Sequence, residues 1–121
     1  MSAEEVAGAF VQHFYTTLNT NPAGLIGLYQ PQSSMTFEGV KFDGPEAIVG
    51  KYVGLGKLTH DPNMTKDVQM SINSSALLIF VTGKLQLADN NPLLFSHCFQ
   101  LVSTGPGQYF INNEIFRLLY G

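Results

Sequence analysis

The sequence is short of cysteine, tryptophan and charge, and each shortage limits what the protein can be. Its single cysteine, Cys98, cannot form a disulfide within the chain, and apolar neighbours favour a buried thiol in a reducing compartment over a nucleophile. His13 and His97 have no partner at the spacing of metal ligands, so both are expected to be structural. We therefore expect no metal and no cofactor.

Charged residues make up 12% of the chain, about half the share of an average soluble protein. Part of the surface must then be apolar or neutral, which favours a permanent protein partner. The six Lys and Arg residues form no run and the net charge is −3, a pattern without the electrostatic footprint of nucleic-acid binding. An acidic balance instead suits a basic protein partner.

Long hydrophobic runs are also missing. The longest, residues 76–81, is too short to cross a membrane. The first residues, Met-Ser-Ala-Glu-Glu, lack the basic and apolar regions of a signal peptide. We expect neither secretion nor a membrane span.

The 121 residues suit a single domain, 1–121, whose N-terminal half is predicted to hold three helices. The first follows a capping-box pattern of Ser2 and Glu5, and its apolar residues recur every four positions: Val6, Phe10, Phe14 and Leu18. A short second helix is expected from Pro22 until Pro31 ends it. The third covers residues 45–55, where Gly50 and Gly54 weaken it, so packing must hold it in place.

From residue 57 onward the apolar pattern changes to period two. Strands are expected near residues 64–72, 77–87, 94–102 and 109–120, with turns at 88–92 and 105–107. One face of the strand at 77–87 is apolar throughout, while Leu78 and Phe80 make the first half of its other face apolar, so we expect that half to be covered on both sides. This order predicts an α+β fold in which three helices pack on the concave face of a strongly curved antiparallel sheet, forming a cone with a hydrophobic cavity.

Residues 35–48 carry the most distinctive local signals. Met35, Phe37 and Phe42, interrupted by Gly39, predict a hairpin or a bulged pair of strands. Glu38 stands beside Phe37, and the residues alone leave two interpretations open. The pair is either the rim of a pocket or an ordinary strand pair with Phe inward and Glu outward.

These elements, with Met-Thr-Phe-Glu-Gly in the first strand and Asn-Glu-Ile-Phe-Arg-Leu near the end, resemble the nuclear transport factor 2 family. Residues 10–15, 44–49, 57–60 and 83–85 also fit, so the resemblance covers nearly the whole chain. It implies a non-catalytic homodimer that carries the GDP-bound small GTPase Ran into the nucleus. It further implies contact with phenylalanine-glycine repeats of nucleoporins, and a location in the cytoplasm, the nucleus and the nuclear pore.

The resemblance also implies a site for Ran. Phe37 stands where members have tryptophan or phenylalanine at the cavity mouth, and Glu38 matches the carboxylate beside it. Asp89 matches the first acid of a loop that pairs with basic residues of Ran, whereas Asn90 or Asn91 replaces the second acid. His60 corresponds to the family's histidine near the acidic rim. The Ran-binding residues that the resemblance implies are therefore Phe37, Glu38, His60, Asp89 and Asn91.

The resemblance also implies that the contact with nucleoporin repeats is weakened. The family's N-terminal tryptophan, at the nucleoporin-binding groove of the dimer, corresponds to Ala3. One aromatic wall is therefore missing there.

Two alternatives from other classes remain open. The same fold hosts ketosteroid isomerases and dehydratases, whose chemistry needs an acid of tuned pKa and a donor opposite it. The acids near a pocket-facing segment are Glu38, Asp89 and Glu114, and the candidate donors are Tyr15 and Tyr109. The other alternative is a peptide-binding scaffold domain, as in messenger-RNA export heterodimers.

Overall fold

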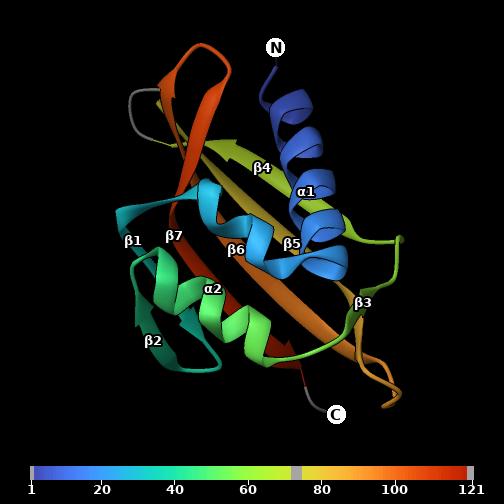
Figure 1. Cartoon of the computed structure of the whole chain (residues 1–121). Coiled ribbons are helices and arrows are strands. Elements are labelled where there is room, and N and C mark those ends of the chain that lie inside the picture. Colours follow the sequence, from blue (N-terminus) through green and yellow to red (C-terminus); the bar gives the residue numbers. More distant parts are fainter. Residues whose placement is uncertain (1, 72–74, 120–121) are drawn as a thin grey trace.

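Helical segments dominate the first half of the chain and long strands the second. The computed structural model describes residues 2–71 and 75–119. Its elements, labelled in Figure 1, are α1 (Ala3–Thr20), the 3₁₀ helix η1 (Pro22–Leu28), β1 (Tyr29–Phe37), β2 (Val40–Asp43), α2 (Pro45–Gly54), β3 (Leu58–His60), β4 (Thr65–Met70), β5 (Ala76–Leu87), β6 (Leu93–Gly105) and β7 (Gln108–Leu119). Within these residues, none of the helices has both the length and the apolar character needed to cross a membrane.

Helix α1 forms as its sequence predicts. The Ser2 hydroxyl accepts the Glu5 backbone N–H at 3.1 Å, and the Glu5 carboxylate accepts the Ser2 N–H at 3.0 Å, so the capping box satisfies two amide groups that the helix leaves unpaired. The apolar stripe faces the sheet, where the rings of Phe10 and Phe14 each lie 4.9 Å from Phe99. The stripe thereby anchors α1 on the concave face of the sheet.

The second helical segment differs from the expectation in type and length. Residues 22–28 form a 3₁₀ helix, and Tyr29 already begins β1. Pro31 therefore lies inside a strand, in the stretch between Tyr29 and Ser34 where the pairing of β1 with β7 is irregular. A proline has no N–H to donate, and such an interruption of the ladder tolerates it.

The sheet is mixed, not wholly antiparallel as predicted. Its strand order is β2-β1-β7-β6-β5-β3, with β4 also paired to β5. All these pairs are antiparallel except β1 with β7, which is parallel. The local pattern of β1 carries no information about the direction of a strand some seventy residues later, so this pairing escaped sequence reasoning.

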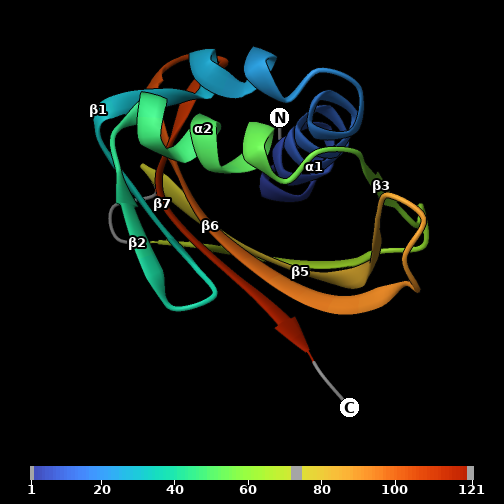
Figure 2. The ribbon, with the colours of Figure 1, turned by 60° about the horizontal axis from the view of Figure 1, so that its bottom comes forward.

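Figure 2 shows α1, η1 and α2 on one side of the sheet, which curls around them without closing. The inner residues of β5 are buried, as expected. On the outer face of the same strand, Leu78 is 45% exposed and Phe80 42% exposed. The expectation that this half of β5 is covered on both sides is therefore not met within one chain.

Candidate functional site

The β1–β2 hairpin places Phe37 and Glu38 at one end of the molecule. Glu38 and Gly39 form its two-residue turn with φ values of 51° and 83°, the left-handed conformation that tight hairpin turns require. The ring of Phe37 is 6% exposed and stacks on Phe116 of β7, with centroids 4.5 Å apart. Lys51 of α2 holds its ammonium group over the Phe37 ring, 5.0 Å from the centroid.

An apolar cavity of about 40 Å³ begins at this aromatic pair. Side chains from α1, β1, α2, β3, β5 and β7 line it: Leu18, Phe37, Tyr52, Leu55, Leu58, His60, Leu85, Leu87, Phe116 and Leu118. Its volume is far below the roughly 300–1,000 Å³ of typical small-molecule sites. The cavity is therefore suited to part of a side chain of a protein partner rather than to a separate substrate.

Two acidic residues are connected to residues that line the cavity. The Glu38 carboxylate accepts the backbone N–H of Leu118, a cavity residue. Asp89 and Asn91 are exposed in the β5–β6 turn, two and four residues after Leu87, which also lines the cavity. The turns that carry Glu38 and Asp89 lie at the same end of the molecule, the lower end of Figure 1.

His60 lies inside the cavity wall, whereas the resemblance suggested the acidic rim. The ring is 8% exposed, and its Nδ1 lies 2.7 Å from the side-chain oxygen of Asn19. Its Nε2 is buried and, within the described part of the chain, has no hydrogen-bond partner. Burial, and to a lesser degree the nearby His97, lowers the pKa of His60 to about 3. His60 lines this cavity and also two surface crevices, one beside Tyr15 and Asn19 and one beside Asp61.

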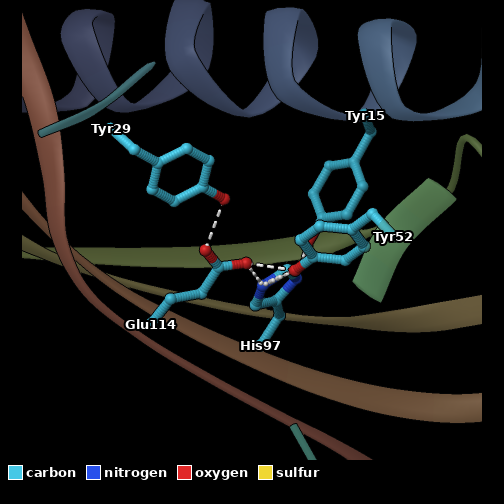
Figure 3. A network of polar contacts seen from close by, with 5 residues as sticks. All are labelled: Tyr15, Tyr29, Tyr52, His97 and Glu114. Carbon is cyan, nitrogen blue, oxygen red and sulfur yellow. Dashed lines mark hydrogen bonds and ion pairs between the residues drawn. The ribbon is translucent and has the colours of Figure 1, made fainter. Parts of the chain in front are cut away.

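Beneath the cavity lies a buried polar network that sequence reasoning did not assemble (Figure 3). Glu114 of β7 is 2% exposed and accepts the Tyr29 hydroxyl at 2.6 Å. Its other oxygen accepts the Tyr52 hydroxyl and lies 2.6 Å from His97 Nε2. His97 Nδ1 in turn lies 2.8 Å from the Tyr15 hydroxyl. The expectation that His97 is a hydrogen-bonded structural residue is confirmed.

One proton arrangement satisfies every bond in this network. If His97 carries its proton on Nε2 and donates it to Glu114, then Nδ1 accepts from Tyr15. Burial first, and the Glu114 charge second, raise the pKa values of Tyr15 and Tyr52 well above the ordinary value. The tyrosines therefore remain protonated hydrogen-bond donors in this network.

Comparisons with known proteins identify the family of this chain. The sequence model of the nuclear transport factor 2 (NTF2) domain matches residues 6–118. The chain belongs to the nuclear transport factor 2 family. Nuclear transport factor 2 of Oryza sativa subsp. japonica is 45% identical over 124 residues that cover all of both chains. Nuclear transport factor 2B of Arabidopsis thaliana is 44% identical, covering 99% of this chain and 97% of its own.

A solved member of the nuclear transport factor 2 family has the same fold. The structure from Cryptosporidium parvum superposes with a TM-score of 0.87 at 38% identity, covering 97% of this chain and 94% of that one. Names shared by full-length relatives suggest a transport carrier rather than an enzyme. Of the two candidate donors, Tyr15 is hydrogen-bonded to His97, and Tyr109 lies in a different crevice, beside Ala3 and Val6.

The requirement of a metal site is a group of ligating side chains around one ion. No group of three or more His, Cys, Asp or Glu side chains in the described residues is placed to hold an ion. Sequence reasoning missed the convergence of Tyr29, Tyr52 and His97 on Glu114. The alternation of β6 and β7 puts His97 and Glu114 on the inner face, which was the available signal.

Proposed function

We propose that this chain is a non-catalytic carrier that binds the GDP-bound form of Ran at the mouth of the cavity. Membership of the nuclear transport factor 2 family supports a role in nuclear transport. The observation that carries the proposal is the apolar cavity walled by the Phe37–Phe116 stack. Glu38 hydrogen-bonds to the backbone of the cavity residue Leu118, and Asp89 is exposed two residues after the cavity residue Leu87. Such a carrier works in both the cytoplasm and the nucleus, and at the nuclear pore.

The mouth combines the two kinds of contact that an interface of this type needs. An aromatic side chain of the partner buries its ring against Phe37, and anchors of this kind commonly dominate the energy of an interface. Glu38 and Asp89 then meet basic residues beside that anchor, which adds specificity and speeds association. His60 serves as part of the inner wall.

Asn91 sets the strength of this interaction. It occupies an exposed position in the same turn as Asp89, where the resemblance implies a second acid. An amide cannot form the ion pair, so binding is weaker and less sensitive to salt than in members with both acids.

The open face of the sheet is our proposed homodimer interface. Five large apolar side chains are about half exposed there: Leu78, Phe80, Leu94, Ile115 and Leu119. Phe80 pairs with Cys98 and Cys98 with Ile115 across three strands, so part of this patch is continuous. Apolar surface of this kind is seldom left open in a monomer, and a two-fold axis covers it on both copies.

Phenylalanine-glycine repeats are the second proposed partner. A crevice of about 110 Å³ lies at the start of α1 between Ala3, Val6, Leu77 and Tyr109. Tyr109 supplies an aromatic wall, but Ala3 leaves the opposite side bare, so binding is weak with a fast off-rate. Chemical-shift titration with a repeat peptide tests this, and no shifts near α1 at millimolar peptide would count against it.

Calorimetry with Ran decides the main proposal. The chain is titrated with GDP-loaded and GTP-loaded Ran at two salt concentrations. We expect heat of binding with the GDP form only, and a modest loss of affinity at the higher salt. Equal binding of both forms, or binding of neither by a folded protein, contradicts the proposal and leaves the peptide-binding scaffold as the function to pursue.

A further inference from the structure

Helix α2 forms one side of the mouth. Tyr52 and Leu55, at its C-terminal end, line the cavity, and Lys51 lies over Phe37. The helix is intrinsically weak, because its N-cap residue Gly44 makes no side-chain hydrogen bond and Gly50 lies in its interior. Something other than helix propensity must hold this wall of the mouth in place.

The hydroxyl of Tyr52 joins α2 to the centre of the sheet. It donates to a Glu114 oxygen and lies 3.3 Å from His97 Nε2. Within the described part of the chain, Tyr52 is the only α2 side chain that hydrogen-bonds to the sheet. The acceptor is a fully buried carboxylate, and hydrogen bonds to charged groups are about twice as strong as neutral ones. This link fixes the angle at which the Tyr52 ring meets the cavity.

We propose that Tyr52 is a positioning residue, which holds α2 at the spacing from β7 that lets the mouth accept an aromatic side chain of the partner. The expected effect on binding rests on the proposed function. The ring of Tyr52 stands edge-on to Phe37, with centroids 6.1 Å apart. Any shift of Tyr52 therefore changes the space beside the aromatic wall. A buried polar network whose groups all have hydrogen-bond partners has a single low-energy arrangement. It therefore keeps the space beside Phe37 constant.

The chain contains a matched control. Tyr29 donates to the other oxygen of the same carboxylate at 2.6 Å, and like Tyr52 it is buried. It begins β1 instead of belonging to α2, and it does not line the cavity. Tyr52→Phe and Tyr29→Phe thus each delete one hydroxyl that donates to Glu114, and only the first releases the wall of the mouth.

The test combines amide hydrogen exchange with binding. Exchange is followed by NMR in wild type, Tyr52→Phe and Tyr29→Phe, each shown to be folded by its spectrum. We expect α2 amides to exchange roughly tenfold faster in Tyr52→Phe alone, the size of effect expected for one lost hydrogen bond to a charged acceptor. We also expect the affinity for GDP-loaded Ran to fall roughly tenfold in Tyr52→Phe and to stay near wild type in Tyr29→Phe.

Three outcomes overturn the inference. They are unchanged exchange of α2 in Tyr52→Phe, equal loss of affinity in both variants, and no loss in either while wild type binds. Failure of wild type to bind Ran refutes the proposed function instead. In that case the exchange comparison still decides whether Tyr52 holds α2.

Discussion

His60 is a residue whose protonation opposes folding. Its ring is buried, one nitrogen faces Asn19, and the other has no partner among the described residues. A protonated ring would bury an N–H without an acceptor, which costs free energy. Burial, and to a lesser degree the nearby His97, accordingly lowers its pKa from 6.5 to about 3, so the folded protein keeps this ring neutral.

Stability is therefore expected to fall as the pH drops below 6.5. Between about pH 3 and pH 6.5 the unfolded chain protonates His60 and the folded chain does not, so the free energy of unfolding rises with pH in this window. One such group contributes roughly 1 kcal/mol per pH unit. Urea unfolding at about pH 7 and about pH 5 measures it. His60→Gln lacks this titration and should lose less stability than wild type, and equal losses would refute the assignment.

Glu38 combines a binding role with a structural one. Its charge lies beside the mouth, and its carboxylate accepts the Leu118 N–H. Glu38→Lys is expected to cost several kcal/mol of binding to GDP-loaded Ran, since it leaves like charges in contact. It should cost only about 1 kcal/mol of stability, for the lost hydrogen bond. Calorimetry and thermal unfolding measure the two effects.

Glu38→Gln is the control for this reversal. Its amide oxygen can still accept from Leu118, so stability should stay near wild type while binding falls by less than in Glu38→Lys. If a folded Glu38→Lys binds as tightly as wild type, Glu38 has no part in the interface.

At the scale of elements, α2 is the helix that local sequence supports least. Its interior Gly50 has room for a side chain, because an added Cβ meets nothing within 4 Å and the backbone is not left-handed. Gly50→Ala is expected to raise the free energy of unfolding by about 0.5–1 kcal/mol. Urea unfolding checks this.

Gly44, just before α2, provides the opposite case. Its φ is 87°, a conformation that a residue with a Cβ adopts only at a cost. Gly44→Ala should therefore destabilise the protein by at least about 1 kcal/mol. If Gly44→Ala stabilised the protein as Gly50→Ala does, helix propensity rather than backbone conformation would determine the stability at the start of α2.

For the whole molecule, the open face of the sheet predicts self-association. Phe80→Asp places a charge in the row that Phe80 forms with Cys98 and Ile115 across three strands. Burying an unpaired carboxylate against a second copy is costly, so the variant should sediment as a monomer where wild type sediments as a dimer. Val53→Asp is the matched control, because Val53 is similarly exposed on α2, away from this face. A monomeric wild type at micromolar concentration, or a dimeric Phe80→Asp, rules out this interface.

The sequence by itself determined the local elements. The capping box and four-residue spacing predicted α1, the alternation of β5 predicted its buried face, and Phe37, Gly39 and Phe42 predicted the hairpin that carries Glu38. These features depend on the backbone preferences and periodicity of residues that are neighbours in the sequence, so they can be read from the sequence itself. The resemblance to a family could therefore be stated, with a site, before any packing was known.

Only the tertiary structure decided how distant segments meet. The parallel pairing of β1 with β7, the burial of His60 and the convergence of Tyr29, Tyr52 and His97 on Glu114 each join residues far apart in the chain. β3, the strand of His60, has three residues, too few to show a period. Contacts of this kind are set by the packing of whole elements into one core, and no local pattern of residues records which partners that packing selects.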